Sequence, residues 1–166
     1  MIKKIISGGQ TGVDRAALDV AINLKINWGG WCPRGRIDEN GTIPQRYTQL
    51  VEIPDDIKNE KENYDTRTKM NIRDSDASLI IVPSIPIPNE IQDGTRLTIQ
   101  YAVKQNARYL ILNLNSEIEH NLLTLMDWIK ANKIQVLNVA GPRESLCPGI
   151  YINSYNFLIK FMGIYF

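Results

Sequence analysis

The stretch KKIISGGQTGVDR, residues 3–15, contains the change of pattern that decides the fold. Its apolar residues up to Ser7 predict a short buried strand, three glycines follow within five residues, and apolar residues near 3.6-residue spacing predict a helix from Gly12 or Val13 to about Leu24. A strand, a glycine turn and a helix in this order are typical of the first unit of a parallel α/β sheet.

The rest of the chain alternates strand-length apolar runs with stretches of helical period. The first strand is predicted to be followed by others near 25–31, 77–82, 108–114 and 135–140, with a further candidate at 47–53. Helices are predicted near 64–73, 95–105, 117–131 and 150–161, whereas 32–41 is turn-rich and predicted to be irregular, and the charged stretch 55–62 to be a solvated connection. We therefore expect one domain, residues 1–166, with a three-layer Rossmann-like α/β fold, a mostly parallel sheet and helices on both faces.

Composition excludes several classes of protein. Hydrophobic residues make up 43% and charged residues 22% of the 166, which is the usage of a globular chain rather than a disordered or membrane one. The formal net charge of +1 gives no global field that would recruit nucleic acid or a membrane. One histidine, His120, and two distant cysteines make a protein-ligated metal unexpected, and the absence of a signal-like apolar run leads us to expect a cytoplasmic protein.

The glycine turn after the first strand is the strongest candidate for a binding site. Glycines permit close backbone approach, and the helix that follows offers unpaired N–H groups to an anion. The turn lacks the Lys-Ser/Thr of a Walker A loop and has Ser7 where a dinucleotide fingerprint has its first glycine. The alternative is an ordinary tight turn in which Asp14 favours the helix N-terminus. The candidate phosphate-binding residues here are Gly8, Gly9, Gln10, Thr11, Gly12 and Asp14.

Other strands are predicted to end in polar residues at the same edge of the sheet, where ligands of open α/β sheets bind. These residues are Arg34 after the second strand, Gly94 and Thr95 after the third, and Arg143 and Glu144 after the last. Three further candidates, Arg67, Asn71 and Asp74, have the spacing of one helix face, which runs into the start of the strand at 77–82. Solvated arginines and ordinary turn or helix caps are the alternatives. We expect all of these candidates except Arg34 to line one crevice with the glycine turn.

Several ordered motifs are similar to those of a known family. These are SGGQTGVDRAALD at 7–19, GWCP at 30–33, RT at 67–68 with Asn71 and RDSDA at 73–77, NVAGPRES at 138–145, and PGIY at 148–151. Together they resemble the putative molybdenum carrier family, part of the SLOG group of Rossmann-like proteins related to the LOG or "lysine decarboxylase-like" proteins. The resemblance implies a ligand that is a nucleotide or the molybdenum cofactor, a phosphorylated pterin that relatives bind without transforming. Thr98 stands where the LOG signature has its glutamate, which argues against LOG-type nucleotide hydrolysis.

We therefore expect a protein that binds a phosphorylated small molecule in a glycine-lined crevice. One alternative is a nucleotide-processing hydrolase, in which Asp74, Asp76 or Glu144 would act as acid or base. The other is a regulatory protein that senses a nucleotide. The apolar tail, residues 155–166, predicts a homo-oligomer such as a dimer. Because the glycine turn is expected at the surface edge of the sheet, a bulky residue at Gly9 should abolish binding and leave the fold intact.

Overall fold

The computed structural model describes residues 1–54 and 59–165, so part of the connection predicted at 55–62 lies outside the described residues. Six parallel strands form one sheet in the order β5-β2-β1-β8-β6-β7. Their bounds are β1 Lys4–Ile6, β2 Asn27–Cys32, β5 Leu50–Glu52, β6 Ala77–Val82, β7 Tyr109–Asn113 and β8 Val136–Ala140. The strands and the parallel sheet predicted from the sequence are confirmed.

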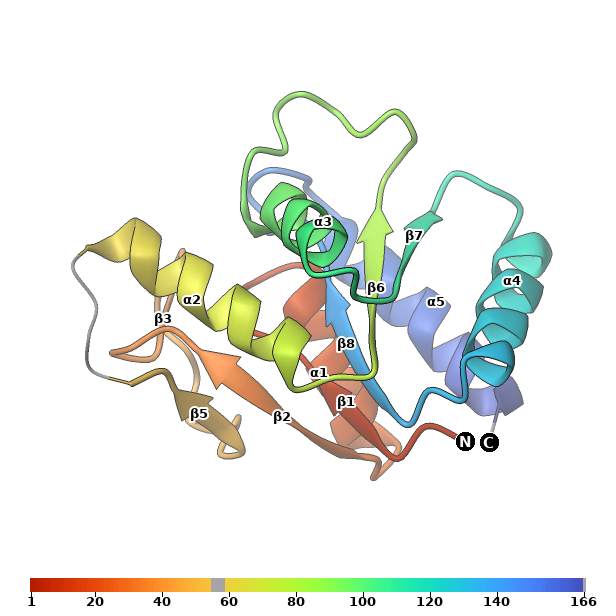
Figure 1. Cartoon of the computed structure of the whole chain (residues 1–166), viewed down its shortest axis with the longest axis horizontal. Coiled ribbons are helices and arrows are strands. Elements are labelled where there is room, and N and C mark those ends of the chain that lie inside the picture. The colour runs from red at the N-terminus through yellow and green to blue at the C-terminus, as the bar shows by residue number, and fades with distance from the viewer. Residues whose placement is uncertain (55–58, 166) are drawn as a thin grey trace.

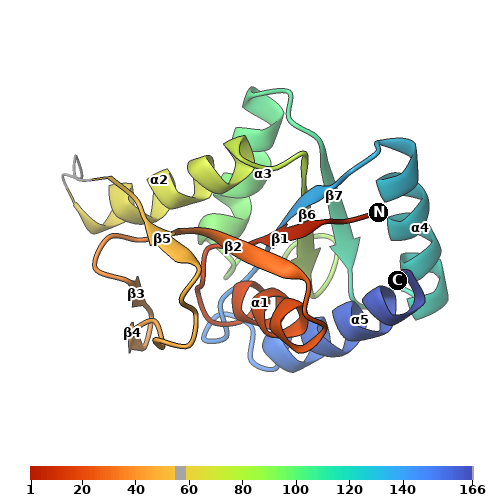
Figure 2. The same cartoon turned by 90° about the horizontal axis from the view of Figure 1, so that it is seen from below.

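Helices cover both faces of this sheet, as Figures 1 and 2 show. One face carries α2 and α3, which pack on each other, and the opposite face carries α1, α5 and α4. Their bounds are α1 Val13–Asn23, α2 Glu60–Arg73, α3 Gly94–Lys104, α4 Ile118–Ala131 and α5 Ile150–Tyr165. The Rossmann-like three-layer architecture is therefore confirmed. In the described residues no helix is long and apolar enough to cross a membrane.

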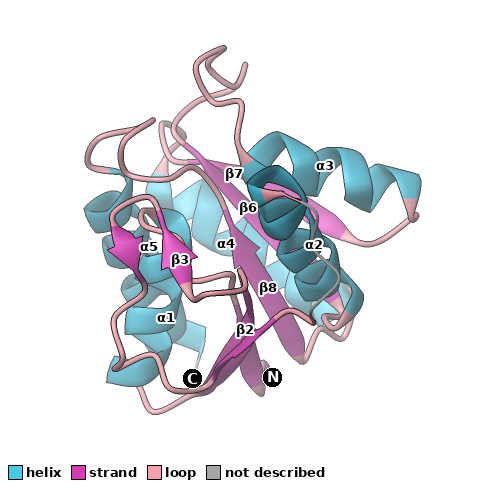
Figure 3. Cartoon of the chain, turned by 90° about the vertical axis from the view of Figure 1, so that its left-hand side faces the viewer, coloured by secondary structure: helices cyan, strands magenta, loops and turns pink. Residues whose placement is uncertain are grey.

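A small antiparallel hairpin, β3 (Ile37–Asp38) and β4 (Gly41–Thr42), lies within the segment that we predicted to be irregular. That prediction was wrong because tertiary contacts, rather than local strand propensity, hold the hairpin. Arg36 donates from its guanidinium to the carbonyls of Tyr47 and Leu50, and Ile43 after the hairpin is buried. Figure 3 shows the hairpin near the N-terminal end of α1, beside the loops that follow the strands.

The apolar tail packs mainly on its own chain. Its helix α5 lies against α1, and Phe157, Leu158, Phe161 and Met162 belong to the buried core. Ile164 is the large aliphatic residue of this tail that stays exposed. The observation from which we predicted a homo-oligomer is thus weaker than the sequence indicated, and the homo-oligomer stays a prediction.

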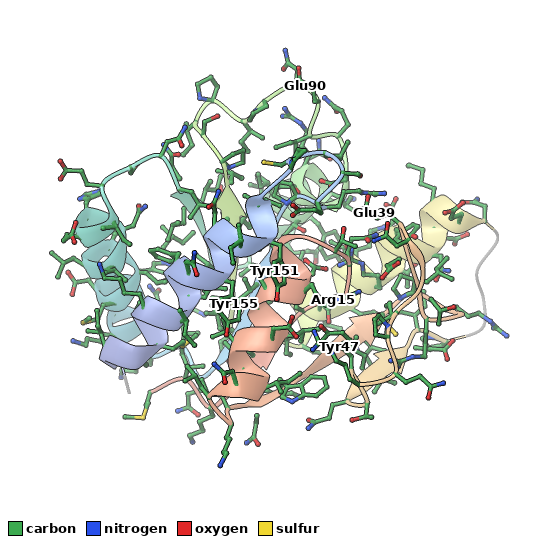
Figure 4. All side chains as sticks on the ribbon, turned by 180° about the vertical axis from the view of Figure 1, so that it is seen from behind. Arg15, Glu39, Tyr47, Glu90, Tyr151 and Tyr155 are labelled. Carbon is green, nitrogen blue, oxygen red and sulfur yellow. The ribbon has the colours of Figure 1, made fainter. Side chains whose placement is uncertain are left out.

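The segment before β5 is connected to two helices through a partly buried carboxylate. Asp19 of α1 accepts hydrogen bonds from the hydroxyls of Tyr47 (2.7 Å) and of Tyr151 in α5 (2.8 Å). Figure 4 shows Tyr47 beside Arg15, whose guanidinium lies over the Tyr47 ring at 4.7 Å. This cluster fixes the segment that carries Ile43 beneath the glycine turn.

The cluster gives the fold a pH dependence in alkaline solution. Burial and then hydrogen bonding to Asp19 raise the pKa of both Tyr47 and Tyr151 from 10.0 to about 12. The unfolded chain therefore releases these protons first, and the free energy of unfolding should fall as pH rises from 10 to 12. Urea denaturation at a series of pH values tests this, with the double variant Tyr47→Phe/Tyr151→Phe expected to show a shallower decline. An unchanged slope in that variant would contradict the assignment.

Candidate functional site

The glycine turn between β1 and α1 is part of the protein interior, because every residue from 5 to 14 is buried. A Cβ on Gly8 would lie 1.8 Å from Nη1 of Arg67, so the glycine makes room for this guanidinium. Gly9 has a φ of +78° and packs against Leu50 and Ile43. The expected position at the surface edge was therefore wrong, and a bulky residue at Gly9 should disturb the fold as well as any ligand.

The start of α1 packs against the loop after β8. Gly12 has a φ of +73°, and a Cβ there would lie 2.2 Å from the carbonyl oxygen of Pro142. That same carbonyl accepts a hydrogen bond from the first N–H of α1, at Val13 (3.2 Å). Gly12 thus serves the close approach of two protein segments, and one N–H of the helix terminus is already used.

A buried ion pair connects the first turn of α1 to α2. Nη1 of Arg67 lies 2.9 Å from Oδ2 of Asp14, and both residues are at least nine-tenths buried. The Asp14 carboxylate also accepts the backbone N–H of Gln10 (3.3 Å). Burial raises the pKa of Asp14 above its ordinary value, although the Arg67 guanidinium opposes this change. The pair holds the turn and α2 at a fixed separation.

A small pocket of about 30 Å³ lies beside this ion pair, at the carboxyl edge of the central strands. This volume accommodates about one or two water molecules. Its walls come from the turn after β1, from α2, from the start of α3 and from the end of β8 with the loop beyond it. The lining residues are Gln10, Asp14, Tyr64, Asp65, Arg67, Asp93, Gly94, Thr98, Ala140, Gly141 and Arg143.

Three residues that line this pocket have a buried donor without a hydrogen-bond partner in the structure: Nε2 of Gln10, Nε of Arg67 and Nε of Arg143. The orientation of the Gln10 amide follows from its oxygen, which accepts the backbone N–H groups of Thr11 (2.9 Å) and Glu39 (3.0 Å). Because Oε1 is engaged in this way, Nε2 is the atom left for the pocket. Unpaired buried donors are rare in native proteins and call for an explanation.

A second cation at the pocket, Arg143, is in a loose ion pair with Asp93. Nε of Arg143 is buried and lies 3.7 Å from Oδ2 of Asp93, which is too far for a hydrogen bond. The Asp93 carboxylate instead accepts the N–H of Thr95 (3.0 Å), as the N-cap of α3, and the N–H of Arg143 (3.2 Å). The guanidinium lies 5.9 Å from the centre of the Tyr64 ring. Arg143 is therefore a cation that a ligand could engage.

The structure brings together part of the predicted set. Gln10, Asp14, Arg67, Gly94 and Arg143 line the pocket. Four others lie next to lining residues. Gly8 packs against Arg67, and the other three follow a lining residue in the sequence: Thr11 and Gly12 after Gln10, and Thr95 after Gly94. Gly9 faces the hydrophobic core instead.

The remaining part of the α2 face does not reach the pocket, contrary to our expectation. A helix that connects parallel strands runs against them, so the end of α2 lies at the amino edge of the sheet, and Asp74 is about 10 Å further along the axis than Arg67. Asn71 accepts from the Trp31 N–H (2.7 Å) and donates to its carbonyl (2.9 Å), which ties α2 to β2. Asp74 accepts from Trp31 Nε1 (2.6 Å) and pairs with Arg73.

Two further candidates have structural roles. Arg34 is exposed, and its backbone N–H and carbonyl bond the side chain of Asn63 (2.7 and 3.0 Å). The Glu144 carboxylate accepts the N–H groups of Gly149 and Tyr151 and so caps α5. Both were correctly predicted near the carboxyl edge, but neither lines the pocket.

Several pocket residues were not among the sequence candidates. Tyr64 precedes Arg67 by three positions, which places both on one helix face, so helical periodicity could have found it. Asp93 is the N-cap of α3 and also lines the pocket. Glu39 does not line the pocket, but its backbone N–H donates to Oε1 of Gln10, and nothing in its turn-rich segment indicated this. In the described residues no group of three or more His, Cys, Asp or Glu could hold a metal ion.

Comparisons with known proteins agree with this fold. Residues 5–162 match the circularly permutated YpsA SLOG family. A crystal structure of a putative molybdenum carrier protein from Syntrophus aciditrophicus superposes with a TM-score of 0.86 at 41% sequence identity, covering 97% of this chain and 95% of that one. No curated protein matches the chain. By its sequence and its fold, the chain belongs to the circularly permutated YpsA SLOG family.

Proposed function

We propose that this protein binds a phosphorylated small molecule at the pocket between the N-termini of α1 and α3. The observation that carries the proposal is that two residues lining one small space, Gln10 and Arg67, each have a buried donor without a partner, Nε2 and Nε. Phosphate oxygens accept several hydrogen bonds at once, and guanidinium groups and helix N-termini are their common partners. Arg143 at the rim adds a third donor group.

The molybdenum cofactor is the ligand that the name of the similar crystal structure suggests. Its phosphate fits the donor set of Gln10, Arg67 and Arg143. Its pterin does not fit the pocket as it stands, because about 30 Å³ is far below the roughly 300 to 1,000 Å³ of ordinary ligand sites. We propose that the phosphate enters the pocket and that the ring lies outside it or widens the rim near Tyr64. A nucleotide would meet the same chemistry.

The hydrolase alternative loses the residues on which it was based. Asp74 and Asp76 lie at the amino edge of the sheet, where Asp76 accepts the backbone N–H groups of Gln135 and Val136 (2.8 Å each). Glu144 is engaged as a helix cap. The carboxylates at the pocket are Asp14, Asp65 and Asp93, and Asp14 is paired with Arg67.

Native mass spectrometry of protein purified from its own cells tests the proposal directly. A co-purified pterin or nucleotide that carries phosphate supports it. A bound molecule without an anionic group contradicts it.

Replacing Arg143 by alanine should weaken binding of that phosphorylated molecule about tenfold or more, because a charge-assisted hydrogen bond contributes about 1.5 kcal/mol or more. Isothermal titration calorimetry measures the change. Arg34→Ala is the matched control, since Arg34 lies at the same edge of the sheet but outside the pocket. The affinity of this variant for the phosphorylated molecule should equal that of the wild type. An equal loss for the dephosphorylated molecule would show that Arg143 recognises another group.

A further inference from the structure

The hairpin tip places a carboxylate on donors beside the pocket. Glu39 accepts hydrogen bonds from the Thr11 hydroxyl and from both the backbone N–H (3.2 Å) and the hydroxyl of Ser145. Burial alone would raise the pKa of Glu39, but the hydrogen bonds from Ser145 and Thr11 outweigh it and lower the pKa below the ordinary value. An ionised carboxylate is thus bound here as a separate anion would be. Figure 4 shows Glu39 at the edge of the molecule.

These donors belong to the same two segments that line the pocket. Thr11 directly follows Gln10, and Ser145 is two residues after Arg143. The Gln10 side chain connects both places, because its Oε1 accepts the Glu39 N–H (3.0 Å) and Gln10 also lines the pocket. The backbone N–H of Glu144 also points to this place, where it donates to the Thr11 hydroxyl (3.1 Å). The Glu39 carboxylate and an anion in the pocket would therefore be close neighbours.

We propose that the Glu39 side chain is a built-in competitor of the ligand, and that an oxyanion of the ligand's phosphoryl group replaces its carboxylate on Thr11 and Ser145. This inference rests on the proposed function, because it concerns the same site. Two anions at adjacent places repel each other, so phosphate binding and the closed position of Glu39 oppose each other. The donors that the carboxylate vacates then extend the pocket toward solvent.

The exchange needs only a side-chain rotation. The hairpin backbone is fixed by the Asp38–Arg15 ion pair (2.7 Å) and by the Asn40 N–H on Asp38 (2.8 Å), while buried Ile43 anchors the strand end. Glu39 itself is only partly buried. Its carboxylate can therefore leave for water while the hairpin stays in place, on the fast timescale of rotamer changes at exposed side chains.

Titration of inorganic phosphate and pyrophosphate by calorimetry tests this inference. Glu39→Ala removes both the charge and the occupying group and should raise phosphate affinity about tenfold or more, a free-energy change of about 1.4 kcal/mol. Glu39→Gln keeps the shape and should raise it less. Glu52→Ala is the matched control, because that carboxylate lies on β5 and holds the Gly35 N–H (2.6 Å) away from the pocket. Adding Thr11→Val to Glu39→Ala should remove the gain.

The outcomes separate this inference from the proposed function. The wild type and Glu39→Ala could bind phosphate with equal affinity while Arg143→Ala still loses binding. That result overturns the inference about Glu39 and leaves the proposed function intact. A gain in phosphate affinity in Glu39→Ala that depends on Thr11 but not on Arg143 supports anion binding at the place of the Glu39 carboxylate. It contradicts phosphate binding in the pocket that Arg143 lines. Absence of phosphate and pyrophosphate binding in every variant, each shown to be folded by far-ultraviolet circular dichroism, overturns both.

Discussion

Replacing Arg67 by methionine is expected to lower the free energy of unfolding by about 3 to 5 kcal/mol, because it leaves the buried Asp14 carboxylate without its cation. Such a loss is a large part of the total stability of about 5 to 15 kcal/mol that is usual for a domain. Urea denaturation measures it. The expected size follows from the burial of both partners and from the 2.9 Å contact between Nη1 and Oδ2.

Two further variants separate the ion pair from the loss of side-chain packing. The double variant Asp14→Asn/Arg67→Met no longer buries a charge, and should recover much of the stability lost in Arg67→Met alone. Arg73→Met is the matched control, because Arg73 is on the same helix, is exposed and pairs with an adjacent residue, so its loss should be below about 1 kcal/mol. A loss equally small in Arg67→Met would show that the pair contributes little.

Replacing Gly12 by alanine is expected to cost about 2 to 6 kcal/mol. With φ +73° and ψ −131°, position 12 is in a region that L-residues rarely adopt, at about 1 to 3 kcal/mol, and a Cβ placed 2.2 Å from the Pro142 carbonyl must push the loop after β8 away, at about 1 to 3 kcal/mol more. Thermal or urea unfolding measures the total. The displaced loop carries Arg143, so phosphate affinity should fall together with stability.

Gly149→Ala separates these two costs. Gly149 has a φ of +86°, but a Cβ there would meet nothing within 4 Å. Its variant should therefore lose only the conformational part, about 1 to 2 kcal/mol. Equal losses in Gly12→Ala and Gly149→Ala would contradict the close approach at Gly12.

The sequence predicts the fold well where one local pattern decides the structure. Strand β6 is six apolar or small residues between Asp76 and Pro83, and all six are buried. Helix α2 is less regular, and its first residues precede the predicted start at Tyr64, because Asn59 caps the helix at Glu62. The short hairpin has no comparable pattern and depends on distant contacts of Arg36 and Ile43.

Only part of the site can be predicted from the sequence, because local patterns do not fix how far along a helix a residue lies or which distant segments meet. Arg67 and Arg143 both line the pocket, because Arg143 follows the end of β8 and Arg67 lies in α2 before that helix reaches the amino edge of the sheet. Asn71 and Asp74 share a helix face with Arg67, but periodicity fixes the face of a helix and not the position along its axis. Glu39 could not be predicted, because only the folded hairpin brings it to Thr11 and Ser145.

The contact of Gly8 with Arg67 also constrains which sequences can share this site. No other residue fits at position 8 while the guanidinium lies on its backbone, so the glycine depends on an arginine far along the chain. Substitutions at the two positions should therefore be inherited together: a relative that has lost the arginine is released from the need for glycine, and one with a side chain at position 8 must place its cation elsewhere. Among relatives, glycine at position 8 together with arginine at position 67 should therefore identify the chains that have the buried ion pair. Chains that have the glycine turn without this arginine should lack it.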